Sequence, residues 1–137
     1  MSRIRSKDTG PEIWVRKVLF SNGYRYRKNV MNVQGHPDIW MPGFRTAIFV
    51  HGCFWHRHSD CKYAYMPKSR VEFWNSKFEQ NVLRDRNVRE ELLKEHIRII
   101  IIWECTVNKL KSSPEGRELL IHKISSFLDS KEMVLEM

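Results

Sequence analysis

Two short apolar segments joined by a long helical pattern constrain the fold of this chain more than any other feature. Residues 46–51 and 97–103 are dominated by apolar side chains, as are strands that are covered on both faces. Between them, residues 72–95 place apolar side chains at helical spacing. Strands joined through a helix lie parallel in one sheet, so this region predicts a strand–helix–strand unit. The helix residues expected to face the core are Phe73, Trp74, Phe78, Val82, Leu92 and Leu93.

The preceding part of the chain predicts a helix and two more strands. Residues 6–12 carry helix-start signals, because Thr9 and Glu12 have capping-box spacing and Pro11 tolerates a first-turn position. This helix is expected to end near residues 22–23. Strands are predicted over 24–30 and 38–41, which suit an antiparallel meander with 46–51. The first helix is expected to bury Ile13, Trp14, Val18 and Leu19.

The remaining segments complete the expected architecture. Residues 52–70 show no period and predict a long loop, whereas residues 115–128 predict a C-terminal amphipathic helix. The residues after that helix are expected to fray. The sequence therefore predicts an α/β fold, a mixed central β-sheet flanked by helices, with residues 1–137 forming one domain.

Length and charge restrict the class of protein. With 137 residues, 42% of them hydrophobic, the chain can bury a core and is not a disordered polymer. It has no apolar run long enough to cross a bilayer and no apolar N-terminal stretch, so we expect a cytoplasmic protein. The 24 Lys and Arg against 16 Asp and Glu give a net charge of +8, which favours a polyanionic partner such as nucleic acid.

The cysteines and nearby histidines form a pattern typical of a metal site. Cys53 and Cys61 bracket His56 and His58 in the long loop, and Cys105 follows the last predicted strand. Cysteines beside histidines in a cytosolic protein more often bind a metal than form disulfides. Cys53, His58, Cys61 and Cys105 make the Cys₃His set of a structural zinc site, with His56 as an alternative to His58. Buried, unliganded cysteines are the simpler alternative.

Acidic residues and a histidine suggest a second site. Asp38 precedes one predicted strand and His51 closes the next, so pairing of these strands would bring both to the same end of the sheet. A carboxylate there can hold Mg²⁺, and a histidine can transfer protons. Each residue also has a simpler role in a turn or in packing. Asp85 is also compatible with simple charge pairing on a helix surface. Glu12 is also compatible with a role limited to the capping box.

Three aromatic residues, Phe54, Trp55 and Trp74, stand near the basic side chains of the loop. Aromatic rings among Lys and Arg suit stacking on DNA bases or wedging between them. Packing in the core is the alternative. The neighbouring basic residues are Arg57, Lys62, Lys68 and Arg70.

Several motifs together resemble those of the very-short-patch (Vsr) mismatch repair endonucleases. The motifs are Gly35-His36-Pro37-Asp38-Ile39, Phe49-Val50-His51-Gly52-Cys53-Phe54-Trp55-His56, Glu72-Phe73-Trp74, Asn81-Val82-Leu83-Arg84-Asp85-Arg86 and Ile102-Trp103-Glu104-Cys105. The resemblance implies a restriction-endonuclease-like fold with a zinc-braced loop. It also implies a Mg²⁺-dependent hydrolase that nicks one strand 5′ of the thymine in a T:G mismatch, leaving a 5′-phosphate and a 3′-hydroxyl. Such mismatches arise by deamination of 5-methylcytosine.

The resemblance further implies a role for each candidate residue. Asp38 and the main-chain carbonyl of Val50 would hold Mg²⁺. His56 would be the general base and His51 would aid the departing 3′ oxygen. The remaining roles fall on Asp85 as the supporting acid, on Glu12 as an outer acid near the metal, on Cys53, His58, Cys61 and Cys105 as structural zinc ligands, and on Phe54, Trp55 and Trp74 as wedges in the duplex.

The resemblance also implies partners. These are double-stranded DNA with a T:G mismatch and, as further candidates, mismatch repair proteins, with the enzyme acting as a monomer and without a membrane. Two other functions stay open, namely a restriction-type endonuclease on unmismatched sites and a non-catalytic zinc-braced DNA-binding domain.

Three features depart from the family pattern. Phe49-Val50-His51 stands where related nucleases have an acid–x–Lys triplet, and histidine can replace the lysine in proton transfer. Relatives carry a DNA-gripping arm before the position of Met1, so weaker DNA binding is expected. The spacing from His58 to Cys61 is one residue longer than in some relatives, so the loop is expected to bulge.

Overall fold

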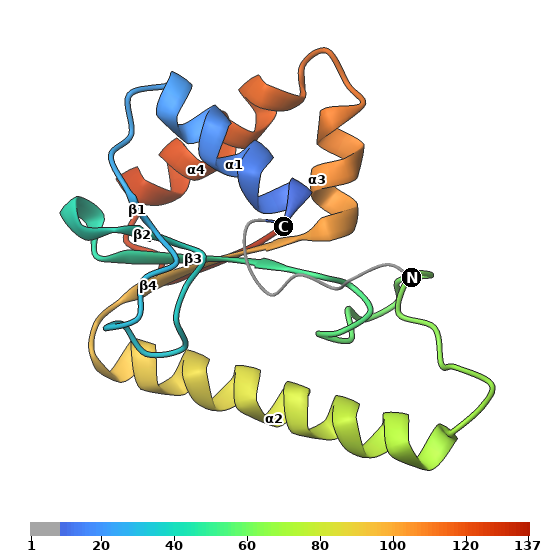
Figure 1. Ribbon diagram of the computed structural model, residues 1–137. Helices are drawn as coiled ribbons and strands as arrows, with labels where there is room; N and C mark the ends of the chain where they lie inside the picture. The colour runs from blue at the N-terminus through green and yellow to red at the C-terminus, as the bar shows by residue number, and fades with distance from the viewer. Residues whose placement is uncertain (1–8) are drawn as a thin grey trace.

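The computed structural model describes residues 9–137, which fold around a five-stranded mixed sheet with helices on both faces (Figure 1). Residues 6–8 of the predicted helix start lie outside this range. Within the described part of the chain, no helix is both long and apolar enough to span a membrane. In chain order the elements are α1 (Gly10–Ser21), β1 (Arg27–Lys28), β2 (Ile39–Met41), the 3₁₀ turn η1 (Pro42–Phe44), β3 (Thr46–His51), α2 (Val71–Lys94), β4 (Arg98–Trp103), α3 (Glu104–Lys111), α4 (Gly116–Asp129) and β5 (Val134–Glu136).

The first four strands have the predicted arrangement. Strands β1, β2 and β3 form an antiparallel meander, and β4 pairs parallel to β3 from Thr46↔Arg98 to His51↔Trp103. The helix α2 makes the crossover between β3 and β4, as the strand–helix–strand pattern predicts. Because β3 and β4 run parallel and in register, their last residues lie side by side at one edge of the sheet.

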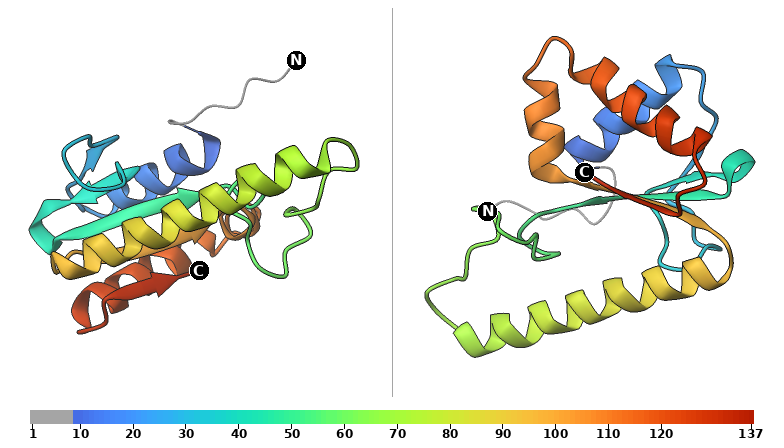
Figure 2. Two further views of the ribbon diagram at one scale, coloured as in Figure 1. Left: turned by 90° about the horizontal axis from the view of Figure 1, so that it is seen from below. Right: turned by 180° about the vertical axis from the view of Figure 1, so that it is seen from behind.

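Two apolar layers cover the two faces of the sheet (Figure 2). Helices α1, α3 and α4 lie over one face, where Ile48 and Ile100 pack among their side chains. Helix α2 lies over the other face, where Ala47 and Ile99 pack against Leu92. Successive strand residues thus face opposite layers, which is why both strands are apolar throughout.

Helix α1 begins as its sequence predicts. Thr9 is the N-cap residue, and its hydroxyl oxygen accepts a hydrogen bond from the Glu12 backbone N–H at 3.4 Å. The buried side of α1 is shifted slightly from the predicted one. Val18 and Leu19 are buried as expected, but Val15 takes the place of the half-buried Ile13 and Trp14.

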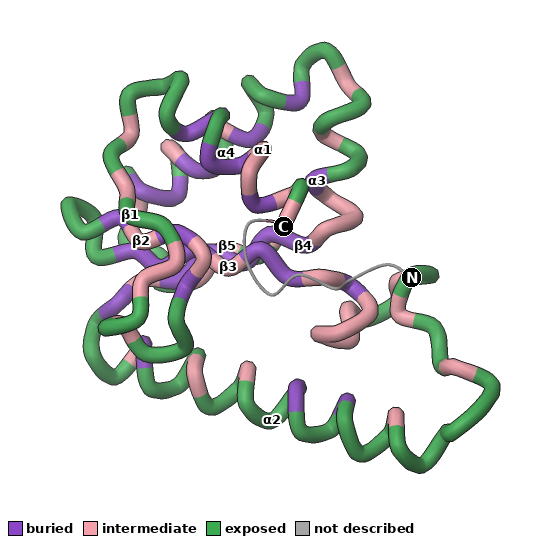
Figure 3. Tube along the Cα trace, viewed as in Figure 1, coloured by how far each residue is buried: buried purple, intermediate pink, exposed green. Residues whose placement is uncertain are grey.

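Helix α2 is much less buried than predicted. Phe73 and Val82 are exposed at 46% and 38%, whereas Phe78 and Leu92 are buried. The reason is length, since 24 helical residues span about 36 Å and six strand residues only about 20 Å. The first half of α2 therefore extends beyond the sheet, and most of its residues are exposed, with only a few buried positions between them (Figure 3).

Three other elements differ from the predictions. The strand expected over residues 24–30 is confined to Arg27–Lys28, because only these two residues pair with β2. The last strand of the central pair ends at Trp103, so Cys105 lies in the first turn of α3, which the sequence analysis did not anticipate. The expected fraying of the C-terminus is wrong, since β5 pairs with β4 and the Met137 N–H donates to the Ile101 carbonyl at 2.9 Å.

Candidate active site and metal centre

The candidate residues gather at the edge of the sheet where β3 and β4 end. His51 is the last residue of β3 and pairs with Trp103 of β4, while Asp38 directly precedes β2. The long loop of residues 52–70 leaves from the end of β3 and returns to α2. Carboxyl ends of parallel strands are a common location for ligand and catalytic sites in α/β sheets.

His51, His56 and Asp85 form one compact group at this edge. Their potential ligand atoms all lie within 4.8 Å of one another. The imidazole rings of His51 and His56 are stacked, with centroids 3.8 Å apart and planes inclined by 3°. Nδ1 of His56 donates to Oδ2 of Asp85 at 2.6 Å. Asp85 thereby selects the tautomer in which the other ring nitrogen of His56 is free to accept a proton.

The two imidazoles of this group differ in their burial and in their partners. Burial, and secondarily the adjacent His56, lower the pKa of His51 to about 3, with Asp85 opposing them. His51 is therefore neutral near pH 7 in the free protein. His56 is only half-buried and is bound to a carboxylate. An imidazole oriented by a carboxylate is the usual arrangement of a general base.

Asp38 belongs to a second, neighbouring acidic group. Its Oδ2 accepts a hydrogen bond of 2.7 Å from the backbone N–H of Val50, the residue before His51. Burial, followed by the nearby carboxylate of Glu12, raises the pKa of Asp38 to about 7, against the opposing effects of the Val50 hydrogen bond and of Arg16. Glu12 is buried, and its Oε2 lies 3.8 Å from Nη1 of Arg16.

The structure thus brings Asp38 beside Glu12 and places it next to β3, but Asp38 is not part of the group formed by the two histidines and Asp85. Two carboxylates that disfavour each other's ionisation in a buried place are suited to a hard divalent cation, which would stabilise both charges. The donor set therefore fits Mg²⁺.

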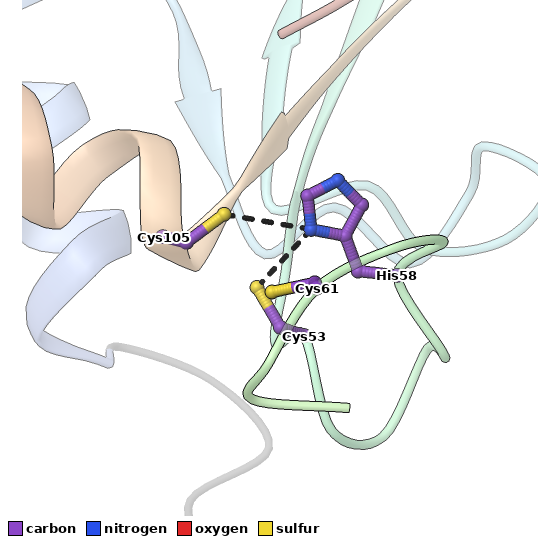
Figure 4. A group of neighbouring side chains, drawn as sticks. All are labelled: Cys53, His58, Cys61 and Cys105. Carbon is purple, nitrogen blue, oxygen red and sulfur yellow. Dashed lines mark hydrogen bonds between the residues drawn. The ribbon is translucent and has the colours of Figure 1, made fainter. Parts of the chain in front are cut away.

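Cys53, His58, Cys61 and Cys105 form the predicted cluster, with all ligand atoms within 4.8 Å of one another. Figure 4 shows Cys105 approaching from the start of α3, opposite the ligands of the long loop. Nδ1 of His58 lies 3.6 Å from Sγ of Cys53 and 3.4 Å from Sγ of Cys105. The cluster contains His58 and not His56, so the choice left open by the sequence is decided by position.

These distances match those of a tetrahedral zinc site. With Zn–S near ~2.3 Å and Zn–N near ~2.0 Å, a tetrahedron separates nitrogen and sulfur ligands by about 3.5 Å. Burial raises the pKa of the Cys53 thiol to about 12, so a thiolate is unfavourable there without a cation. The four residues therefore fit a structural zinc ion, which would join the long loop to α3.

The aromatic residues Phe54, Trp55 and Trp74 are half-buried and pack on one another. Ring centroids are 5.2 Å apart for Phe54 and Trp55 and 5.7 Å apart for Trp55 and Trp74. Asn81 of α2 is buried and donates to the Trp55 carbonyl at 3.1 Å. The three rings thus form a supported cluster beside the two histidines and are not isolated surface side chains.

Two residues of this region have no role in the sequence analysis. The Trp103 ring stacks on His58 at 4.1 Å and meets the edge of His51 at 5.2 Å, so it contacts both the Cys/His cluster and the histidine pair. Its Nε1 donates to Oε2 of Glu136 in β5 at 2.9 Å. The position of Trp103 at the end of an apolar strand was the available signal for it, whereas Glu136 lies in a segment without any recognisable pattern.

The mixed sheet flanked by helices, the half-buried Asp38 beside the buried Glu12 and the carboxylate-bound histidine define an α/β protein with a candidate site for metal-assisted hydrolysis.

Comparison with known proteins specifies the family. The family model described as DNA mismatch endonuclease Vsr matches residues 1–63. The type II nicking enzyme V.NmeAIP of Neisseria meningitidis serogroup A is 42% identical, over 95% of this chain and 90% of the relative. The type II nicking enzyme V.XorIIP of Xanthomonas oryzae pv. oryzae is 43% identical, over 80% of both chains. The DNA mismatch endonuclease Vsr of Escherichia coli is 36% identical, over 88% of this chain and 72% of the relative.

The chain belongs to the Vsr family of DNA endonucleases. The family resemblance predicted from the motifs is thereby confirmed, and so is the prediction that the protein is an endonuclease acting on DNA. The family also makes the non-catalytic alternative wrong.

Proposed function

We propose that this protein is a Mg²⁺-dependent, strand-specific endonuclease that nicks DNA 5′ of the thymine in T:G mismatches left by deamination of 5-methylcytosine. The observation that carries the proposal is the Asp85-bound His56 stacked on His51, next to the half-buried Asp38 and the buried Glu12. Relatives whose names describe a mismatch endonuclease and nicking enzymes support it.

In this proposal each group has one task. Asp38 and the main-chain carbonyl of Val50 would hold Mg²⁺, with Glu12 behind them, and the ion would stabilise charge on the scissile phosphate. His56 removes a proton from the attacking water at the ring nitrogen not bound to Asp85. His51 assists the departing 3′ oxygen. Asp85 is a positioning residue, because it acts through His56.

The two other clusters support this chemistry. Zinc held by the four Cys/His residues would fix the loop that carries His56, since Cys53 and His58 flank it on either side. The cluster of Phe54, Trp55 and Trp74 would wedge into the duplex at the mismatch. A mismatched pair stacks less well, so opening the duplex costs less free energy there.

The proposal extends to the state and setting of the protein. The whole chain would act as one domain and as a monomer on cytoplasmic DNA, with mismatch repair proteins as further partners. The mixed sheet and its two apolar layers, which join elements from both halves of the chain, support a single folding unit.

A strand-nicking assay tests the proposal. Duplexes with a labelled thymine strand, carrying T:G or matched T:A at one position, are incubated with the protein and Mg²⁺ and resolved on a denaturing gel. We expect a nick 5′ of the thymine in the T:G duplex only. Asp38→Ala should abolish nicking, at least ~10³-fold, because the metal ligand is lost, whereas Asp129→Ala at the exposed end of α4 should not change it.

The outcomes distinguish the alternatives. Equal cleavage of both duplexes would establish a restriction-type specificity for unmismatched sites. Full activity of Asp38→Ala would contradict the proposed metal site, and a complete loss of cleavage with added EDTA, restored by Mg²⁺, would support it.

A further inference from the structure

A basic and aromatic hollow lies beside α1 and is lined by none of the residues given a role above. It has a volume of about 440 Å³ and is bounded by α1, the segment leading to β1 and the start of α4. Helices α1 and α4 contact each other here. We call it the α1 hollow and use five of its lining residues, namely Arg16, Lys17, Phe20, Tyr26 and Arg117.

The charge of the α1 hollow selects an anionic occupant. Three of its lining residues are Lys or Arg, and its lining contains no carboxylate side chain. The Arg117 guanidinium is oriented by a hydrogen bond of 3.0 Å from its Nη2 to the hydroxyl of Ser21. Lys17 is exposed one helical turn before Ser21. Two cations beside one hollow, one of them oriented by a hydrogen bond, suit phosphate groups.

An exposed aromatic ring narrows the class of that anion. Phe20 is 75% exposed, although it lies on a helix that buries Val18 and Leu19 beside it. Tyr26 lines the hollow from the segment before β1. Aromatic rings among cations are the combination that contacts both the base or sugar and the phosphate of a nucleotide. An acidic peptide would use the cations but would leave Phe20 in water.

The position of the hollow relates it to the candidate reaction centre. Arg16 lines the hollow and also lies 3.8 Å from Glu12, which faces Asp38. A helix rises about 1.5 Å per residue, so Lys17 and Phe20 lie roughly 8 and 12 Å along α1 from Glu12. One DNA strand rises about 3.4 Å per nucleotide, so these distances correspond to about two to four nucleotides.

We infer that the α1 hollow is a subsite for the DNA backbone two to four nucleotides from the scissile phosphate, with Lys17 and Arg117 on phosphate and Phe20 against the adjoining sugar or base. The inference rests on the proposed function only for the position of the scissile phosphate. It adds a contact with the flank of the substrate that the acidic pair, the histidines and the aromatic cluster do not make.

Fluorescence anisotropy with a labelled T:G duplex, without metal so that no cleavage occurs, tests the inference. We expect Lys17→Gln and Arg117→Gln each to weaken binding about 3- to 10-fold and to reduce the slope of log K against log salt by about one. Phe20→Ala should weaken binding by a similar factor without changing the slope. The controls are Lys123→Gln, on α4 but outside the hollow, and Met31→Ala, which matches Phe20 with 72% exposure.

Shortening the duplex provides the second arm. A duplex that ends within two base pairs of the mismatch on the flank covered by the hollow should bind wild type and Lys17→Gln equally. Unchanged affinity and salt slope in all three variants would overturn the inference. Competition by poly-glutamate, but not by DNA, at the hollow would assign it to an acidic protein instead. These binding results stand even if no duplex is nicked, which would count against the proposed function alone.

Discussion

At the scale of single residues, burial is the main cause of the shifted pKa values of two side chains of the site, Asp38 and His51. Asp38 is half-buried and lies near Glu12, while His51 is buried between the rings of His56 and Trp103. His56 remains half-exposed and takes its orientation from Asp85. The raised pKa of Asp38 and the lowered pKa of His51 both follow mainly from burial, which the sequence alone does not reveal.

The raised pKa of Asp38 predicts how divalent-metal binding depends on pH. The metal binds the ionised carboxylate, so protons compete with it below pH 7, and the apparent affinity should fall about tenfold per pH unit there. In the metal-free protein, the contribution of Asp38 to the free energy of unfolding changes with pH in the opposite direction. The protonated carboxyl tolerates burial, so its contribution is present below about pH 4 and is lost as the pH rises through 7.

Thermal unfolding with and without Mg²⁺ measures both effects. The rise in Tm caused by Mg²⁺ should be larger at pH 8 than at pH 6. In Asp38→Asn the Mg²⁺ effect should disappear at both values. An equal rise in Tm at both pH values in the wild type would contradict the assignment of Asp38.

At the scale of elements, β5 has a role that reaches the site. This strand pairs with β4, and its Glu136 holds the indole N–H of Trp103, whose ring contacts His58 and His51. The C-terminal strand therefore supports a ring that lies between the Cys/His cluster and the histidine pair. Trp103 and Glu136 are positioning residues in this arrangement.

Glu136→Ala tests this support. Loss of one hydrogen bond should cost about 1 kcal/mol of stability, and kcat for nicking should fall severalfold while KM stays constant, because His51 and not DNA binding is affected. Glu136→Gln keeps an acceptor and should restore most of kcat. The exposed Glu132→Ala is the control. A change in KM alone, or no rescue by glutamine, would indicate a merely structural strand.

At the scale of the whole molecule, the Cys/His cluster joins parts of the chain that little else connects. The long loop has no helix or strand. The Arg57 guanidinium links parts of the loop to one another by donating to the carbonyls of Phe54, Ala64 and Tyr65, and contacts of Trp55 and His56 attach the loop to α2. A metal in the cluster would attach this loop to α3, which packs against the helical layer on the other face of the sheet.

Removing that metal should loosen the loop without unfolding the sheet. We expect one zinc per chain by mass spectrometry of the purified protein, and a Tm lowered by roughly 5–15 °C in Cys61→Ser. Trypsin should then cut at Lys62 or Lys68 faster than in the wild type. The control is Ser59→Ala, which is in the same loop and exposed. Absence of zinc together with an unchanged Tm in Cys61→Ser would contradict a structural metal site.

The sequence was sufficient for the elements whose signals are local or strongly periodic. Thr9 and Glu12 mark the start of α1, and the apolar runs at 46–51 and 97–103 predict parallel strands, because a helical crossover allows little else. The Cys₃His set was also recognisable, since candidate zinc ligands can be identified from residue type alone. By contrast, α3 and β5 have weak local signals and form because β4 offers them a place to pack and pair.

The sequence by itself thus determined the antiparallel meander, the helical crossover and the residue types of both clusters, because periodicity and ligand chemistry are properties of the chain. Only the tertiary structure decided that His58 joins the cysteines while His56 joins Asp85, two residues apart in one loop. It also decided the exposure of half of α2 and the stacking of His51 on His56. The physical reason is that burial and partners come from segments distant in sequence, and no local pattern records them.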